Sequence, residues 1–163
     1  MAPTAKQTHA ISATASLPAL YRHTLTTIEP LFALNGAVLA FFTPQTYLST
    51  MTRDSALLTP NTTFLYTEIG GAWLYFAFVE AVVLRQFDDL RLWRMLCWAM
   101  LLSDAAYCVS VAQALGGWGA WMALSDWTVS DHAVFWSTVP VALVRLLVVL
   151  GVGVTEVPGQ KTE

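Results

Sequence analysis

Four long apolar stretches dominate the pattern of hydrophobic and polar positions along the chain. They cover about residues 26–47, 63–84, 93–115 and 132–154, and polar segments separate them. Each stretch is close to the roughly 20 residues that a helix needs to cross the hydrocarbon core of a bilayer. Backbone groups in lipid must be hydrogen-bonded within the spanning segment, and the alternation typical of barrel strands is absent. The pattern therefore predicts an all-α fold, an integral membrane four-helix bundle.

The two ends of the chain differ from this apolar middle. Residues 1–20 are polar and rich in Ala, Thr and Ser, and they lack the basic start, apolar core and cleavage site of a signal peptide. We expect them to form a flexible N-terminal tail. Residues 21–155 then form a single four-helix transmembrane domain, and residues 156–163 form a C-terminal tail.

The composition supports a membrane protein and narrows the chemistry. The chain is 56% hydrophobic and 12% charged, whereas a soluble domain has about 25% charged residues. Its net charge of −3 gives no sign of nucleic-acid binding. Cys97 and Cys108 fall on one predicted helix, roughly 16 Å apart along its axis, so we expect packing residues rather than a disulfide. Without a CxxC or HExxH pattern, no metal site is predicted.

The distribution of Arg residues predicts an orientation in the membrane. Arg85, Arg91 and Arg94 surround the second loop, whereas residues 116–131 contain neither Lys nor Arg. The positive-inside rule then places both termini and the 85–92 loop in the cytoplasm.

The opposite, lumenal side has two features of its own. Asn61 starts an N-glycosylation sequon next to the membrane surface. Trp118, Trp121 and Trp127 crowd one loop, and Trp favours the membrane interface. We expect this loop to lie on the lumenal surface or to cap the bundle, with contact to a substrate as the alternative.

Five ionisable residues lie inside the predicted spans, where a charge is costly and by default suggests function. They are Glu29, Glu68, Glu80, Asp104 and Arg145. Counted at 1.5 Å per residue, all of them except Glu68 lie in the cytoplasmic half. We expect Glu80, Asp104 and Arg145 to face one another rather than lipid, with the guanidinium neutralising one or two carboxylates.

The role of this group stays open between chemistry and structure. Asp104, Glu80, Arg145 and Glu29 are the candidate catalytic residues, because a buried carboxyl group that keeps its proton can act as an acid. A pairing with Arg145 can also do no more than hold the helices in register. Glu29 precedes Pro30 at the expected start of a helix, where a carboxylate complements the helix dipole.

Side chains at helical spacing around the carboxyl groups outline a candidate binding site. Tyr107 shares a face with Asp104, Trp73 and Phe76 share the face of Glu80, and Tyr75 is a further polar group on that helix. Asn35 falls at a depth similar to that of Asp104. The candidate substrate-binding residues are therefore Asn35, Trp73, Tyr75, Phe76 and Tyr107. The alternative is plain aromatic packing.

Three stretches resemble a family of small four-span fungal membrane proteins, whose members occur in or near secondary-metabolite gene clusters. They are "YRHTLTTIEPLFALNGAVLAFFTP", "FDDLRLWRMLCWAMLLSDAAYC" and "LVRLLVVLGVG". The resemblance covers most of residues 17–154 and implies that Glu29, Pro30, Asp104 and Arg145 match recurrent polar positions of that family. In site chemistry, without a shared motif, the chain resembles the membrane terpene cyclases of fungal meroterpenoid pathways, whose intramembrane carboxyl groups protonate an epoxide or alkene.

Two functions from different classes remain open. The first is an enzyme of fungal secondary metabolism, a cyclase or isomerase that acts by acid/base chemistry on a lipophilic intermediate. The second is a non-catalytic lipid-binding, substrate-binding or scaffold protein. No nucleotide, haem, flavin or metal motif is visible, so no cofactor is expected. The expected partners are a lipophilic small molecule and the lipid bilayer of the endoplasmic reticulum. Binding to nucleic acid is not expected. Oligomerisation stays open, and a proton-coupled transporter, as a further alternative, would require it.

Overall fold

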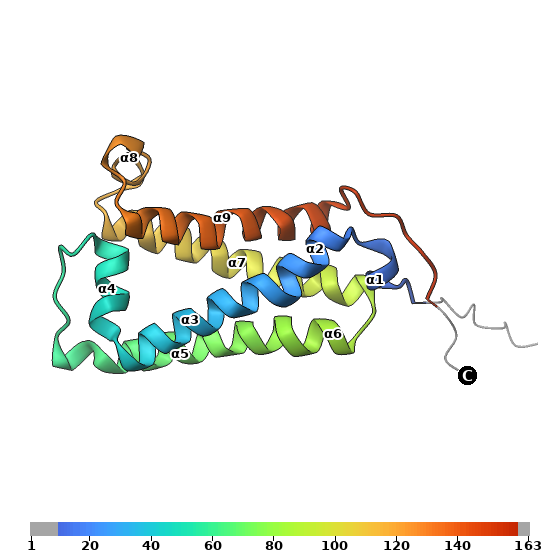
Figure 1. Ribbon diagram of the computed structural model, residues 1–163, viewed down its shortest axis with the longest axis horizontal. Helices are drawn as coiled ribbons and strands as arrows, with labels where there is room; N and C mark the ends of the chain where they lie inside the picture. Colours follow the sequence, from blue (N-terminus) through green and yellow to red (C-terminus); the bar gives the residue numbers. More distant parts are fainter. Residues whose placement is uncertain (1–9, 160–163) are drawn as a thin grey trace, which may run out of the picture.

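The computed structural model describes residues 10–159, which form helices joined by loops, with one isolated bridge near the termini. Four helical segments are long and apolar enough to cross a membrane: Ala19–Phe42, Pro60–Gln86, Leu90–Ala114 and Val129–Leu150. The predicted four-helix membrane bundle is therefore confirmed, and the chain is a multi-pass membrane protein (Figure 1).

The helical elements of the described residues follow one another in a simple order. They are α1 (Ala13–Ser16), α2 (Ala19–His23), η1 (Thr24–Ile28), α3 (Glu29–Phe42), α4 (Pro44–Thr52), η2 (Pro60–Thr62), α5 (Thr63–Phe78), η3 (Val79–Val83), α6 (Leu84–Gln86), α7 (Leu90–Ala114), α8 (Trp118–Trp121), η4 (Leu124–Asp126) and α9 (Val129–Leu150). The elements η1 and η3 are π-helical turns, and η2 and η4 are 3₁₀ turns.

The first span is one continuous helix formed by α2, η1 and α3. Pro30 lies inside it and cannot donate to the carbonyl of Thr26, one turn earlier; the wider π-helical turn before Pro30 accommodates this defect. The span ends at Thr43, which leaves helical geometry, and Pro44 starts the separate helix α4. The predicted bounds, 26–47, are therefore too late at both ends.

The second and third spans begin a few residues earlier than the predicted 63–84 and 93–115. A 3₁₀ turn opens the second span, and α6 extends it by two residues. At the start of α7 the Asp89 carboxylate accepts the backbone N–H groups of Arg91 and Leu92, at 2.8 and 3.4 Å. This N-cap satisfies orphan donors and sets the beginning of the helix.

The fourth span has clear signals at both ends and a proline inside. Thr128 and Asp131 form a capping box at its start. It ends at Gly151, whose φ of 73° lies in the left-handed region that glycine adopts readily. The predicted 132–154 is thus too late at both ends. Pro140 lies within α9 and leaves the carbonyl one turn before it without its helical donor.

The four spans pack as two pairs, α3 with α5 and α7 with α9 (Figure 1). The first pair is tight because two glycines allow close approach: a Cβ on Gly36 would lie 3.1 Å from the indole of Trp73, and one on Gly70 would lie 2.9 Å from the ring of Phe41. Helix α4 crosses at one end and contacts both α7 and α9. Helix α4 therefore joins the two pairs at that end.

Both described ends of the chain, at residues 10 and 159, lie at the same end of the bundle, opposite α8 (Figure 1). Residues 10–20, assigned above to a flexible tail, are folded there, and residues 1–9 lie outside the described residues. Ala13 and Leu17 are buried in a core cluster with Trp93. The prediction of a tail is therefore wrong for residues 10–20, because small apolar side chains dock onto the bundle.

Hydrogen bonds hold this segment to the loop before α7. The Asp88 carboxylate accepts the Ser12 hydroxyl and the Thr14 backbone N–H, each at 2.6 Å. Partial burial opposes the charged form of Asp88, but these hydrogen bonds prevail and lower its pKa.

The C-terminal segment is also docked. The Val157 N–H donates to Ser16 Oγ at 3.0 Å, and Arg94 pairs with Glu156 at 3.2 Å. Residues 156–159 of the predicted tail therefore have fixed contacts, and residues 160–163 lie outside the described part.

The Trp-rich segment between α7 and α9 packs on the adjoining ends of these two helices. Trp121 is buried against Val111, Ala112 and Val134, and the Trp127 indole donates to the Trp121 carbonyl at 2.7 Å. On α7, Cys97 is buried and Cys108 packs against this cluster, and both thiols are free. The prediction that the cysteines are packing residues is confirmed.

Candidate functional site

Arg145 of α9 lies among three carboxylates that come from the other three spans. Its Nη2 contacts Glu29 at the start of α3 and lies 2.6 Å from Glu80 Oε1 in η3, and its Nη1 contacts Asp104 in α7. These four residues are called the Arg145 cluster below. The prediction that Glu80, Asp104 and Arg145 face one another is confirmed, and Glu29 joins them.

The two π-helical turns help to orient Glu29 and Glu80 towards Arg145. Glu29 directly follows η1, and Glu80 lies within η3. A π turn adds a residue to the helical turn and so rotates the following side chains, and such turns are frequent at functional sites. Glu29 stands inside the continuous first span, so its proposed role at a helix N-terminus is wrong.

Burial makes the Arg145 cluster electrostatically unusual. Glu80 is 0% exposed and Arg145 is 1% exposed, while the Asp104 side chain keeps 17% exposure. The guanidinium also lies 5.6 Å from the centre of the Phe76 ring, within cation–π range. Three carboxylates share one cation, so full ionisation would leave a net charge of −2 in a nearly dry site, which is costly unless protons or a ligand offset it.

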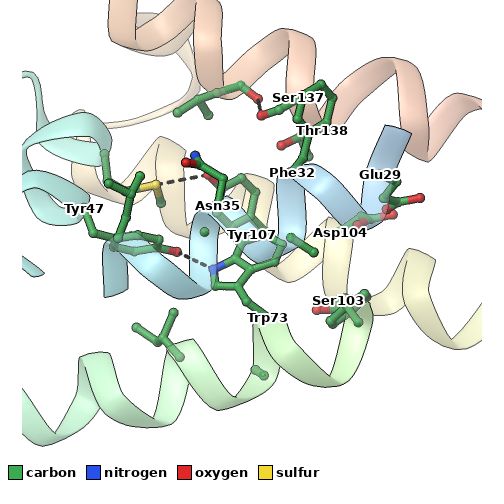
Figure 2. Close-up of a pocket in the computed structure, with 18 of the residues that line it drawn as sticks. Glu29, Phe32, Asn35, Tyr47, Trp73, Ser103, Asp104, Tyr107, Ser137 and Thr138 are labelled. Atoms are coloured by element: carbon green, nitrogen blue, oxygen red, sulfur yellow. Dashed lines mark hydrogen bonds between the residues drawn. The ribbon is translucent and has the colours of Figure 1, made fainter. Parts of the chain in front are cut away.

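A cavity of about 790 Å³ begins at the Arg145 cluster and runs between the two helix pairs towards α4 (Figure 2). Its charged lining residues are Glu29, Asp104 and Arg145, all at one end. The remaining lining is mostly apolar and aromatic, with scattered hydroxyl and amide groups: Phe32, Ala33, Asn35, Gly36, Leu39, Tyr47, Thr50, Met51, Ile69, Ala72, Trp73, Phe76, Ser103, Ala106, Tyr107, Ser110, Ala133, Val134, Trp136, Ser137 and Thr138. This size and lining are typical of a small-molecule site.

The cavity also reaches the outside of the bundle. Phe32 of α3 and Trp136 of α9 line it, and they are 44% and 63% exposed. Both residues lie within membrane spans, so this part of the cavity lies at the depth of the spans and not in a loop region.

Most of the predicted contact residues line the cavity, but two predicted site residues do not. Asn35, Trp73, Phe76 and Tyr107 belong to its walls (Figure 2). The structure places Tyr75, predicted to contact substrate, outside the cavity lining: it is 61% exposed, because adjacent helical residues point in different directions.

Glu80 is the second site residue that the cavity lining lacks. It is fully buried and packs against Arg145. The structure therefore places Glu80, a predicted proton donor, against Arg145 and not in the cavity lining. Glu68, the fifth ionisable residue, is exposed on α5 and is likewise not a lining residue.

Helix α4 supplies cavity residues that the sequence analysis missed. The Trp73 indole donates to the Tyr47 hydroxyl at 3.1 Å, and the Tyr107 hydroxyl donates to Met51 Sδ at 3.2 Å (Figure 2). These bonds fix two aromatic rings against α4. Pro44, which starts α4, is a sequence signal for a separate element. The direction of α4 across the bundle cannot be read from the hydropathy pattern.

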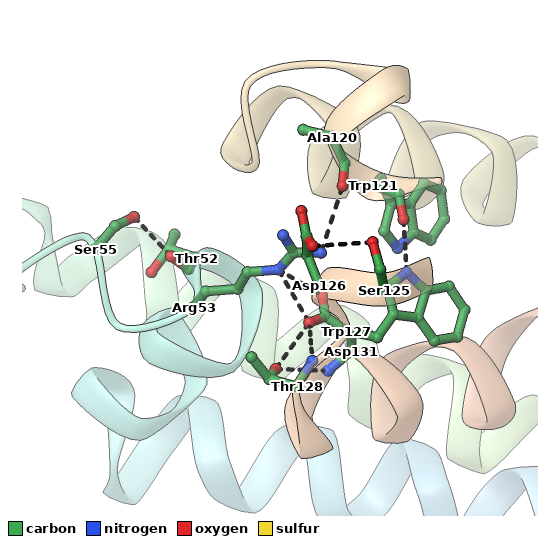
Figure 3. Close-up of polar contacts among 10 residues, drawn as sticks. All are labelled: Thr52, Arg53, Ser55, Ala120, Trp121, Ser125, Asp126, Trp127, Thr128 and Asp131. Atoms are coloured by element: carbon green, nitrogen blue, oxygen red, sulfur yellow. Dashed lines mark hydrogen bonds and ion pairs between the residues drawn. The ribbon is translucent and has the colours of Figure 1, made fainter. Parts of the chain in front are cut away.

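A polar junction holds α4 in place at the end opposite the termini (Figure 3). Asp131 accepts two bonds from Arg53 Nε, at 3.1 and 2.9 Å, and bonds from the backbone and hydroxyl of Thr128, at 2.7 Å each. Arg53 Nη2 also lies 3.5 Å from the Ala120 carbonyl. The junction ties α4, the α8 segment and the start of α9 together, next to the far end of the cavity.

Residues 14–155 match the family described as Domain of unknown function (DUF7704). The chain belongs to this family. The DUF7704 match includes the Arg145 cluster, every residue of the cavity lining and the α4 junction. No curated protein and no solved structure matches the chain. The chemistry of the site therefore has to be argued from its geometry.

Proposed function

We propose that the protein is a membrane enzyme, an acid/base isomerase or cyclase that needs no cofactor and acts on a lipophilic molecule from the bilayer. One observation carries the proposal: Glu29 and Asp104 lie at the charged end of an otherwise apolar, aromatic cavity between the membrane spans. Such a cavity selects a lipophilic substrate and presents it to carboxyl groups that water does not surround.

The charge of the Arg145 cluster supports a proton donor. Holding a proton on one carboxyl group reduces the uncompensated negative charge of three buried carboxylates around one guanidinium. Asp104 is the proposed acid, because it lines the cavity and is the most exposed of the three carboxyl side chains. Glu29 also lines the cavity and is the proposed second carboxyl group.

The proposed reaction starts when Asp104 transfers its proton to an alkene carbon or an epoxide oxygen. In an epoxide, a C–O bond then breaks and its electron pair stays on oxygen as a hydroxyl group. A neighbouring alkene supplies the electron pair for a new C–C bond to the cationic carbon. A proton finally leaves the carbon beside the last cationic centre and returns to the carboxylate. The product is an isomer of the substrate, so no oxidant or reductant is needed.

The other residues have positioning and binding roles in this proposal. Arg145 holds the two carboxyl groups in place, and Glu80 supports Arg145 from outside the cavity lining. Trp73, Phe76 and Tyr107 offer aromatic faces along the cavity, which stabilise a cationic intermediate.

The proposed reaction is tested with Asp104→Asn. Membranes with the wild-type protein and with the variant are incubated with an epoxidised farnesyl-type isoprenoid, and isomers of equal mass are measured by mass spectrometry. Asn cannot donate a carboxylic proton, so product formation should fall about 10²–10⁴-fold. Glu68→Gln removes an exposed carboxyl group outside the cavity and should leave the rate unchanged. An Asp104→Asn protein that is stable and fully active overturns the proposal.

We further propose that the protein lies in the membrane of the endoplasmic reticulum with both termini cytoplasmic, in fungal secondary metabolism. The resemblance to four-span fungal proteins supports the setting. Arg22, Arg85, Arg91 and Arg94 lie in the loops and helix ends on the side of the termini, against Arg53 on the other side, which supports the orientation.

The orientation is tested by cysteine labelling of sealed microsomes. Phe87, in the loop before α7, and Leu124, in the short turn η4, lie at opposite ends of the bundle and are 56% and 67% exposed. A membrane-impermeant maleimide should label Phe87→Cys in intact vesicles, and Leu124→Cys only after permeabilisation. The reverse pattern contradicts the proposed orientation.

A second function has a specific observation in its favour. Every carboxyl group of the Arg145 cluster contacts the guanidinium, as expected if the cluster only joins the four spans. The protein is then a non-catalytic lipid-binding or substrate-binding protein. In that case Asp104→Asn lowers the thermal stability, removal of the Arg145 charge in the same chain partly restores it, and no isomer depends on Asp104.

A further inference from the structure

The cavity has more negative than positive groups around its charged end. The groups that face one another there are Glu29 from α3, Glu80 from η3, Asp104 from α7 and Arg145 from α9. The thiols of Cys97 and Cys108 on α7 are also near, and they carry no positive charge. Within residues 10–159, the salt bridges to these carboxylates come from Arg145 alone. When all three carboxyl groups are ionised, the protein itself leaves an excess of negative charge at this end of the cavity.

Two carboxylate oxygens at this end, one on Glu29 and one on Glu80, are buried without a hydrogen-bond partner within residues 10–159. Glu29 Oε1 contacts Arg145, but Glu29 Oε2 is buried and has no hydrogen-bond partner within residues 10–159. Glu29 is 9% exposed and lines the cavity. An unpaired buried acceptor is costly, so a proton or a positively charged group close to Glu29 would be stabilising.

Aromatic side chains line the cavity next to these carboxyl groups. The rings of Trp73 and Phe76 lie 6.1 Å apart, and those of Trp73 and Tyr107 lie 5.7 Å apart at an interplanar angle of 77°. Aromatic faces attract cations, most strongly where water is excluded. An organic cation with hydrophobic substituents fits such a site, because acidic groups can contact its charge and aromatic side chains can contact its substituents.

From these three observations we infer that the cavity binds lipophilic cations, with the cationic centre beside Glu29 and Asp104 and the hydrophobic groups against Trp73, Phe76 and Tyr107. The inference deepens the proposed function and rests on it, because the same position would stabilise a carbocation after proton transfer. A bound cation offsets the same negative charge that a proton offsets. Protons and the cation therefore compete for the site.

Tetraphenylphosphonium is a suitable probe, because its charge is permanent and any pH dependence then belongs to the protein. Tetraphenylborate has nearly the same size and the opposite charge. Binding of each labelled ion is measured to the protein in phosphatidylcholine nanodiscs, with empty nanodiscs subtracted. We expect saturable binding of one tetraphenylphosphonium per chain, weaker at pH 6 than at pH 8, and no saturable binding of tetraphenylborate.

Variants locate the binding. Glu29→Gln and Asp104→Asn should each weaken tetraphenylphosphonium binding about tenfold, as expected for the loss of roughly one ionic contact. Glu68→Gln, which removes an exposed carboxyl group outside the cavity lining, should bind as the wild type does. A comparison of the wild-type protein with the two ions and the two pH values tests the inference even if a cavity variant does not fold.

The outcomes separate this inference from the proposed function. No saturable cation binding by the folded wild-type protein, equal binding of both ions, or affinity that rises as the pH falls overturns the inference. Cation binding without any Asp104-dependent isomer supports the inference and contradicts the proposed enzyme. An Asp104-dependent isomer without cation binding supports the enzyme and overturns the inference.

Discussion

Replacing Arg145 by Met removes the one group that all three buried carboxylates contact. The side chain is 1% exposed and joins α9 to elements of the other three spans. Met fills a similar elongated space with an apolar side chain. Glu29, Glu80 and Asp104 then lie together without a cation, and each one that remains ionised is an uncompensated buried charge.

The expected loss of stability is large. Removing one partner of a buried ion pair costs about 3–5 kcal/mol. For a chain of this length, about 2–4 °C of Tm correspond to each kcal/mol, so the Tm should fall by about 6–20 °C. We expect the fall to be smaller for Arg145→Lys, because the ammonium keeps the charge but lacks the planar fork that reaches several carboxylates at once.

The assay is thermal unfolding of the purified protein in mild detergent, followed by tryptophan fluorescence. The matched control combines Arg145→Met with Glu29→Gln, Glu80→Gln and Asp104→Asn. Since this variant has no buried charge at the site, it should recover most of the lost Tm. An unchanged Tm in Arg145→Met, or a combined variant no more stable than the single one, would refute the electrostatic reasoning.

Three further predictions concern other parts of the molecule. Arg53→Gln removes the ion pair that joins α4 to α9, at a cost of about 1–2 kcal/mol. Amide hydrogen exchange should accelerate in α4 and not in α5, and an α4 exchange rate equal to that of the wild type would contradict the role of this ion pair. Gly36→Val forces a Cβ against the indole of Trp73 and should destabilise by about 1–3 kcal/mol, whereas Gly71→Ala, which meets nothing within 4 Å, should not lower the Tm. The folded-state pKa of Asp88 is lowered, so its contribution to stability is present above about pH 4 and is lost as the pH falls through the folded-state pKa; the Tm difference between wild type and Asp88→Asn should be constant from pH 5 to 8 and shrink in acid.

The number of spans and their order could be predicted from the sequence, because hydropathy over about 20 residues is a local property. The meeting of Asp104, Glu80 and Arg145 could also be predicted, since isolated charges facing lipid would be expensive. The capping box of Thr128 and Asp131 is a local signal too, and it would have set the start of the fourth span correctly.

The direction of individual side chains depended on features without a clear sequence signal. The π-helical turns η1 and η3 change the helical phase next to Glu29 and Glu80. As a result, Glu29, assigned to a helix N-terminus, joins the Arg145 cluster, and Glu80, assigned to the substrate, contacts Arg145 outside the cavity lining. Regular periodicity also could not exclude Tyr75, which lies on the outer surface.

The sequence by itself determined which segments lie in lipid: four apolar helices, with a few ionisable residues that are stable there only when they are paired. The tertiary structure alone decided where there is empty space. The cavity exists because α3 packs on α5 and α7 packs on α9, while the Arg145 cluster at one end and α4 at the other hold the pairs together. Such a void depends on contacts between residues far apart in the chain, and no local pattern of hydrophobic and polar positions encodes it.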